Sequence, residues 1–197
     1  MKKEQLDTLY KAFNRYTFIS ENDFELAVPF FKEKKTSKGE HFNLVGVICK
    51  NLAFIQKGIF RIYLTIEKTG EQQNLFFFTE NEFLVSIMSF LTQTPCNYTI
   101  EALEESEFIQ ISHANLMEVY KLSHAWETFG RKLAEQHFMF LQQRTESLLT
   151  KTAQERYEDM LMQFPDIMNR VPLYHISSYL GIKGPSLSRI RKNITLR

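Results

Sequence analysis

The stretch 123–150 constrains the fold most, because it contains no proline and only one glycine. Its apolar residues, among them Trp126, Phe129 and Leu133, recur close to every 3.5 residues, which is typical of one face of a long helix. At about 1.5 Å per residue such a helix extends about 40 Å, which is more than the core of a small domain covers. Part of the apolar face must therefore pack on something else, and a second copy of the chain is the simplest partner.

Three polar residues, Gln136, His137 and Arg144, interrupt this apolar face. They either set the register between two helices, or they indicate that the face packs on the rest of its own chain. Both alternatives remain open at this point. We predict a homodimer whose dimerisation residues are Trp126, Phe129, Leu133 and Phe140.

Before the long helix, residues 34–111 form short runs of strand character that are separated by turn signals such as Lys57-Gly58. Short strands at such regular spacing are typical of an antiparallel sandwich or barrel. We predict a small jelly roll, a double-sheet β-roll. Its predicted strands are 52–56, 59–66, 75–79, 98–103 and 108–111.

Helices are predicted on both sides of this roll, so the fold class is α+β. Apolar residues at helical spacing place a first helix over 6–13, and Ser20 is the predicted N-cap of a second helix. Ser112 caps a further helix after the roll. The next helix covers 152–164 and ends at Pro165, and 166–171 is predicted to be a linker.

Charge is unevenly distributed along the chain. Residues 167–197 contain six basic residues and no acidic one, whereas the rest of the chain carries 18 basic and 23 acidic residues. The basic residues are Arg170, Lys183, Arg189, Arg191, Lys192 and Arg197. This difference indicates an anionic partner for the C-terminal segment, with nucleic acid the first candidate and a solvated basic tail the alternative.

Composition excludes several classes of protein. Cys49 and Cys96 are too few for a disulfide scaffold and are not spaced like zinc or iron–sulfur ligands, so we predict reduced structural thiols. The N-terminal sequence lacks the apolar core of a signal peptide, and no stretch is apolar enough for a membrane helix. We therefore expect a soluble, cytoplasmic protein with no membrane partner and no cofactor.

The segment 172–194 has the layout of a helix-turn-helix. Pro172 suits the first turn of a helix, and Gly181 stands where the chain must turn with a positive φ. Ile176 and Leu180 form one apolar face before the turn. In the second helix, which Pro185 opens, the residues Leu187, Ile190 and Ile194 face inward at i, i+3 and i+7.

This arrangement leaves polar and basic side chains on the outer face of the second helix. We predict DNA-binding residues at Ser186, Ser188, Arg189, Arg191 and Lys192, with double-stranded DNA as the partner. Arginine can bind guanine through two hydrogen bonds, and serine or lysine can hold phosphates. The alternative is a plain helical hairpin whose exposed face is basic.

The order of helical lead, β-roll, long helix and terminal helix-turn-helix resembles the Crp/Fnr superfamily of bacterial transcription regulators. The most specific stretches are 179–182, 186–192, 82–86, 89–91 and 98–103. They look like those of the compact members found in Bacteroidetes-type bacteria. The resemblance implies a cyclic-nucleotide-binding-like sensor domain over 1–122, a dimerisation helix over 123–150 and a DNA-binding domain over 151–197.

The family's cyclic-nucleotide pocket is built on a cassette that resembles Gly-Glu-Leu followed by Arg-Ser/Thr-Ala. Here the corresponding positions carry Ser86 and Cys96, so both charged anchors are absent and the cassette is degenerate. We predict no tight cAMP binding, because an unpaired phosphate is costly to bury. The cavity either holds another small effector or is filled by side chains such as Phe83 and Tyr98. The candidate effector-binding residues are Val85, Ser86, Asn97, Tyr98 and Thr99.

Three function classes compete for this sequence. The favoured one is a sequence-specific DNA-binding transcription regulator with a β-roll sensor. The second is a regulatory or interaction module that keeps the fold but does not bind DNA. The third is a cupin-type enzyme, but His41 has no second histidine within the roll to form a metal site, so we predict no enzymatic activity.

Overall fold

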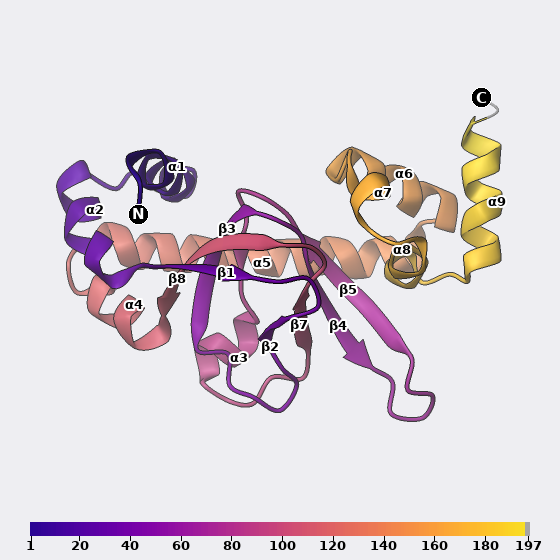
Figure 1. Ribbon diagram of the computed structural model, residues 1–197, viewed down its shortest axis with the longest axis horizontal. Helices are drawn as coiled ribbons and strands as arrows, with labels where there is room; N and C mark the ends of the chain where they lie inside the picture. Colours follow the sequence, from indigo (N-terminus) through magenta and orange to yellow (C-terminus); the bar gives the residue numbers. More distant parts are fainter. Residues whose placement is uncertain (196–197) are drawn as a thin grey trace.

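The computed structural model describes residues 1–195, and Figure 1 shows the order of its helices and strands. The chain begins with α1 (Lys3–Asn14), α2 (Glu21–Ala27) and the short 3-10 helix η1 (Val28–Phe30). The roll then consists of β1 (Lys32–Thr36), β2 (His41–Asn43), β3 (Asn51–Lys57), β4 (Phe60–Thr65), β5 (Gln72–Phe78), β6 (Phe83–Leu84), α3 (Ile87–Thr92), β7 (Thr99–Ala102) and β8 (Ser106–Ser112). The remaining helices are α4 (His113–Tyr120), α5 (His124–Thr150), α6 (Ala153–Gln163), α7 (Ile167–Arg170), α8 (Leu173–Leu180) and α9 (Gly184–Thr195).

The strands form two antiparallel four-stranded sheets. One has the order β1-β8-β3-β6 and the other the order β2-β7-β4-β5, which is a double-sheet roll as predicted. The five strands expected from the sequence correspond to β3, β4, β5, β7 and β8. The sequence pattern did not reveal β1, because all but one of its residues are exposed and they do not alternate between apolar and polar.

Gly58 marks the point where the chain passes from β3 in one sheet to β4 in the other. Its φ is +110°, in the region that glycine favours, and a Cβ built there would lie 2.0 Å from the Ser106 Oγ atom. The sharp crossing therefore needs a residue without a side chain.

The N-terminal helices and the first half of α5 share one core with the β1-β8-β3-β6 sheet. The ring of Phe13 packs edge-on against Trp126 and Phe129, with centroids 4.9 and 4.7 Å apart. As predicted, Ser20 caps α2 by accepting a hydrogen bond from the Asp23 amide. The N-terminal helices thus cover the face of α5 that would otherwise be exposed.

This packing corrects the predicted dimer contact. Trp126, Phe129 and Leu133 are buried within their own chain, with exposed fractions of 0, 0 and 4%. Phe140 is half-buried, and its ring lies 5.3 Å from that of Phe76 on β5. Trp126, Phe129 and Leu133 already pack in the core shared with α1, α2 and the β1-β8-β3-β6 sheet, so these three side chains do not form the surface that a second copy would meet.

Aromatic side chains fill the interior of the roll. Phe108 lies 5.6 Å from Phe42 and 5.8 Å from Phe60, ring centre to ring centre. Phe78, Ile62 and Ile100 belong to the same buried cluster. Close packing of this kind leaves the space between the sheets to the protein's own side chains.

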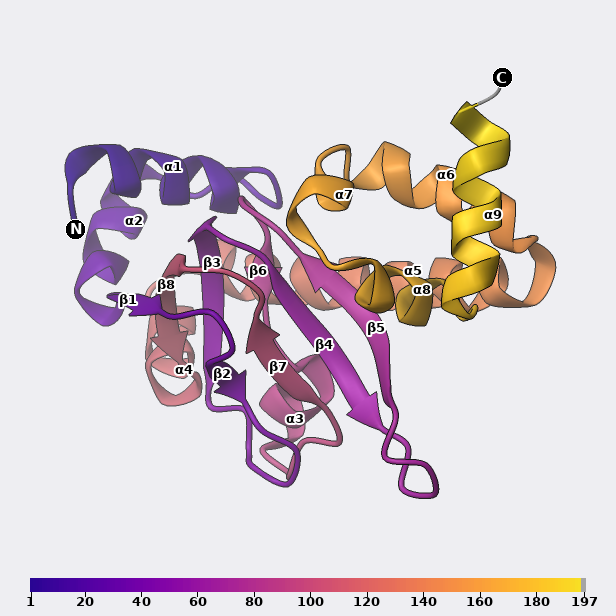
Figure 2. The same ribbon diagram turned by 45° about the vertical axis from the view of Figure 1, so that its right-hand side comes forward.

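The C-terminal helices gather at one end of α5, beside β5, as Figures 1 and 2 show from two sides. The segment 166–171 is not the predicted linker: it contains α7, and Ile167 and Val171 are buried in the core of the C-terminal helices. Arg170 binds Glu80 and Glu104 of the roll with N–O distances of 2.6 and 2.5 Å. These ion pairs and the buried apolar residues attach the segment to the roll.

Candidate functional site

The two helices α8 and α9 are joined by a tight turn at Gly181. Its φ is +69°, as the sequence predicted, and its amide donates to the Ser178 carbonyl. The Ile182 amide donates to the Ser177 carbonyl, which completes a Schellman end of α8. A glycine is needed here because the left-handed backbone strains other residues.

The second helix, α9, presents its polar face to solvent. Leu187 is 1% exposed and packs with Ile190 and Ile194 in the C-terminal core, as the spacing predicted. All five predicted DNA-binding residues are exposed: Ser186, Ser188, Arg189, Arg191 and Lys192. In Figures 1 and 2 α9 stands at the outer edge of the molecule, away from the roll. Arg197, which contributes to the basic charge of this end, lies outside the described residues.

A buried polar network joins α8 to the roll. Arg61 on β4 is 4% exposed, and its guanidinium donates to the Glu101 carboxylate at 2.8 and 2.5 Å. The same group donates to Asn74 and to the Nδ1 atom of His175 on α8, at 3.2 and 2.9 Å. Because Nδ1 accepts this hydrogen bond, the His175 ring is neutral. Burial and the nearby Arg61 lower the pKa of His175 to about 4.

Ser178 extends this junction along the edge of β5. Its hydroxyl accepts a hydrogen bond from the Asn74 backbone amide and donates one to the Gln72 backbone carbonyl, both at 2.9 Å. The Gln73 side-chain amide also donates to the Ser178 carbonyl. The helix that precedes the turn is therefore held on the roll by hydrogen bonds as well as by apolar contacts. Sequence reasoning missed this junction, although a lone arginine inside the apolar strand β4 was a signal for it.

The second half of α5 carries a different apolar face, which residues 1–195 leave exposed. Phe138, Leu141 and Leu148 are 67, 41 and 46% exposed. With Thr145 they occupy positions i, i+3, i+7 and i+10, which follow one side of a helix at the 3.5-residue spacing of a coiled coil.

The predicted effector-binding residues lie on and around the segment that contains α3, but their polar groups are largely engaged within the protein. Ser86 accepts a hydrogen bond from the Cys96 thiol at 3.0 Å, so the two residues that the resemblance aligns with the charged anchors contact each other. Thr99 accepts from the Val45 amide at 3.4 Å. Val85 is buried, whereas Asn97 is exposed. Tyr98 packs against the core of the roll, which agrees with the alternative that side chains fill this space.

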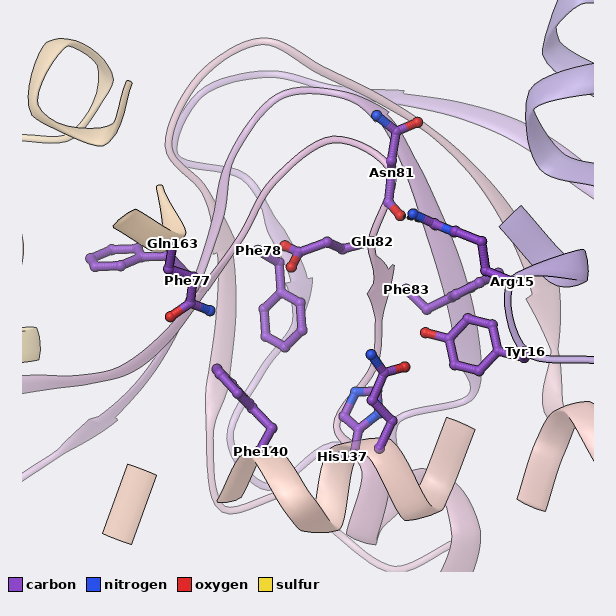
Figure 3. Close-up of a pocket in the computed structure, with 11 residues that line it drawn as sticks. Arg15, Tyr16, Phe77, Phe78, Asn81, Glu82, Phe83, His137, Phe140 and Gln163 are labelled. Atoms are coloured by element: carbon purple, nitrogen blue, oxygen red, sulfur yellow. Dashed lines mark hydrogen bonds between the residues drawn. The ribbon is translucent and has the colours of Figure 1, made fainter. Parts of the chain in front are cut away.

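A pocket of about 330 Å³ lies elsewhere, between the end of α1, the β5–β6 turn, α5 and the end of α6 (Figure 3). Its lining residues are Arg15, Tyr16, Phe77, Phe78, Asn81, Glu82, Phe83, Gln136, His137, Phe140 and Gln163. Four of them, Phe83, Gln136, His137 and Phe140, stand out in the sequence for other reasons. They come from four separate segments, so no local pattern brings them together.

Residues 33–123 match the family model of the cyclic nucleotide-binding domain. The matched residues span the double-sheet roll, from β1 through β8. No protein of curated function matches the chain in sequence.

Solved structures extend the similarity beyond the roll. FixK2 from Bradyrhizobium japonicum has a TM-score of 0.74 at 14% identity, over 84% of this chain and 85% of its own. A protein assigned to the Crp/Fnr family of transcriptional regulators, from Eubacterium rectale, has a TM-score of 0.72 at 16% identity, over 94 and 88%. The cAMP-bound chain PfPKA-R has a TM-score of 0.54 at 19% identity. The match covers 60% of this chain and only 43% of PfPKA-R. At these identities the similarity establishes the fold alone: a double-sheet roll followed by helices that are arranged as in these structures.

Within residues 1–195, no helix has both the length and the apolar character needed to cross a membrane. The same part of the chain holds no cluster of histidine, cysteine and acidic side chains arranged to bind a metal ion.

Proposed function

We propose that this chain is a sequence-specific DNA-binding transcription regulator in which α8 and α9 form a helix-turn-helix. One observation carries the proposal: α9 buries Leu187 against its own core while it exposes serine and basic side chains along the opposite face. A helix placed in this way can enter the major groove with its polar face. The overall fold shared with FixK2 and the Eubacterium rectale protein supports this proposal.

Within α9, Arg189 is the residue that we assign to base recognition. Its side chain can bind the O6 and N7 atoms of guanine together. Arg191 and Lys192 would contact phosphates, with Ser186 and Ser188 assisting. Gly184-Pro185, at the start of the helix, offers no side-chain hydrogen bond to a base. Direct readout by this helix is therefore expected to be sparse.

We further propose that the regulator is a homodimer that pairs through the second half of α5. The helix has 27 residues and extends about 40 Å, but only its first half is buried in the sensor core. The contact surface that we propose consists of Phe138, Leu141, Thr145 and Leu148, in place of the buried Trp126, Phe129 and Leu133. A two-fold dimer would place its two recognition helices about 34 Å apart, on successive turns of the duplex.

This proposal includes a division of the chain into a sensor domain over 1–122, a dimerisation helix over 123–150 and a DNA-binding domain over 151–197.

We propose that cAMP is not a tight ligand of the sensor. Neutral Ser86 and Cys96 occupy the anchor positions and bond to each other, and phenylalanine rings fill the roll. A cyclic phosphate would find no cation at these two positions to pair with. Calorimetry with cAMP tests this point, and micromolar binding would contradict it.

The DNA-binding proposal is tested by selecting sites from random duplex DNA with the full chain. We expect enrichment of a pseudo-palindrome whose half-site centres are about one helical turn apart. A purified, folded protein that enriches no sequence would instead favour a regulatory module that does not bind DNA.

The dimer is tested by sedimentation of the wild type and of Leu141→Asp. The aspartate places a charge in the exposed apolar face, so we expect this variant to be monomeric at concentrations where the wild type is a dimer. Leu26→Asp is the matched control, because Leu26 is 51% exposed on α2 and lies outside the proposed contact. A monomeric wild type, or equal effects of both variants, would contradict the assignment.

A further inference from the structure

The pocket beside α5 combines aromatic walls with polar side chains whose hydrogen bonds are only partly made by residues 1–195. The rings of Tyr16, Phe77, Phe78, Phe83 and Phe140 line it. Figure 3 shows the Glu82 carboxyl extending from the β5–β6 turn toward Phe78, and the Tyr16 hydroxyl pointing toward the same space. At about 330 Å³ the pocket is within the size range of small-molecule sites.

Glu82 is the central polar group of this pocket. Its Oε2 atom accepts hydrogen bonds from the Thr79 amide and hydroxyl, at 2.6 and 3.5 Å. No residue among 1–195 bonds to its Oε1 atom. Burial raises the pKa of this carboxyl, with smaller opposing effects from Thr79 and Arg15. A half-satisfied carboxylate among aromatic rings gains most from a ligand that brings a hydrogen-bond donor with positive charge.

The cations near Glu82 do not supply this partner. The Arg15 guanidinium is exposed and donates to the Asn81 carbonyl, at the edge of the pocket. Arg170 is engaged with Glu80 and Glu104. Aromatic faces themselves attract cations, so the walls and the carboxylate favour the same kind of ligand.

His137 adds a further feature on the α5 side. Its Nδ1 atom lies 2.9 Å from the Leu133 carbonyl and must donate to it, so Nε2 carries the lone pair. Within the described chain this buried Nε2 atom has no hydrogen-bond partner. Burial lowers the pKa of His137, so the imidazole stays neutral and does not repel a positively charged ligand.

We propose that this pocket binds a small aromatic molecule that carries a nitrogen cation. The cationic group pairs with Glu82 Oε1, and the ring lies among the phenyl groups of Phe78 and Phe140. The site is separate from the cassette around Ser86 and Cys96, and its binding of a ligand does not depend on the DNA-binding proposal. Gln163 at the end of α6 lines the same pocket, so a ligand there touches both the roll and the C-terminal helices.

Three probes of similar size test this inference by NMR titration of the full chain without DNA. Benzamidine combines an aromatic ring with a cation, benzyl alcohol has the ring alone, and benzoate has the opposite charge. We expect benzamidine to bind most tightly and to shift the signals of the His137 ring and the Gln163 side-chain amide. Equal binding of all three probes, binding of benzoate in preference, or no shift at these residues would overturn the proposal.

Two variants locate the interaction. Glu82→Gln keeps the shape of the side chain but removes its charge, so benzamidine affinity should fall about tenfold while benzyl alcohol affinity stays nearly unchanged. Glu25→Gln, an exposed carboxyl on α2, is the control and should leave both affinities unchanged. Unchanged benzamidine binding in Glu82→Gln would contradict the role of Glu82.

Gln136→Trp provides a second test that does not alter the carboxyl. Gln136 is exposed at the edge of the pocket, so a tryptophan there should occupy the space without disturbing the core. We expect it to abolish binding of benzamidine and benzyl alcohol. Lys132→Trp, on an exposed position of the same helix, should have no effect. Thermal unfolding checks that each variant is folded, and retained binding in Gln136→Trp would place the probes outside this pocket.

Discussion

The helices α8 and α9 adjoin in sequence but have opposite relations to the rest of the molecule. Five of the eight residues of α8 are buried, and its polar side chains bond to the roll through Arg61, Asn74 and Gln72. In α9, Leu187 is the only buried residue among those whose side chains the structure describes. The basic residues of α9 face outward. Polar residues therefore have different roles in the two helices: those of α8 hold the fold together, and those of α9 are available to a partner.

The largest expected effect comes from breaking the α8 junction. Arg61→Ala removes the cation that pairs with Glu101 and bonds to His175, and it leaves these buried groups without their partner. We expect the free energy of unfolding to fall by about 3–5 kcal/mol, measured by urea denaturation. Arg131→Ala breaks an exposed pair with Glu135 and should cost less than about 1 kcal/mol. Similar losses in both variants would mean that the junction contributes no more than a surface ion pair.

A second effect on the α8 side should depend on pH through His175. Its folded pKa of about 4 lies below the ordinary 6.5, so the unfolded chain takes up the proton first as the pH falls. The contribution of neutral His175 is therefore complete above about pH 6.5 and is lost as the pH falls toward 4, by about 3 kcal/mol in total.

The measurement is the difference in unfolding free energy between the wild type and His175→Asn across this pH range. The difference should shrink on acidification, because the wild type loses a contribution that the variant lacks. His124→Asn, on the exposed start of α5, should follow the wild type at every pH. A difference that is independent of pH would show that His175 is not held neutral by the fold.

On α9 we expect smaller effects that appear in DNA binding rather than in stability. Arg189→Ala should weaken binding by about 1–3 kcal/mol and relax base preference at one position of each half-site. Its free energy of unfolding should change by less than about 0.5 kcal/mol, because the side chain is exposed. Site selection and fluorescence anisotropy measure the two DNA effects. Identical motifs from the wild type and the variant would remove Arg189 from base recognition.

The smallest expected effect is that of Lys192→Ala. A phosphate contact carries no sequence information, so binding to all sequences should weaken alike and the preferred motif should not change. The slope of log affinity against log salt concentration should decrease by about one, which a salt titration measures. An altered motif with an unchanged slope would indicate that Lys192 contacts a base.

Local sequence signals predicted most of the helices and strands. The N-caps Ser20 and Ser112 and the turn at Gly181 lie where the sequence placed them, because capping and positive φ depend on a few neighbouring residues. The strands β1, β2 and β6 were missed, because β1 is exposed and the other two have only three and two residues. The prediction of a linker over 166–171 is wrong, because Ile167 and Val171 are apolar and are buried.

The sequence alone determined that this chain has a roll of short strands, a long helix and a terminal pair of helices with an inward apolar face and an outward basic face. These features follow from periodicity and turn residues, which act within a few positions of the chain. Only the tertiary structure decided that α1 and α2 cover the first half of α5, so that Phe138 and Leu141 rather than Trp126 and Phe129 are exposed. It alone brought Arg61 to His175, 114 positions away, and Tyr16 to Glu82 beside α5. The physical reason is that periodicity identifies an apolar face, whereas the surface that covers it depends on contacts between distant residues.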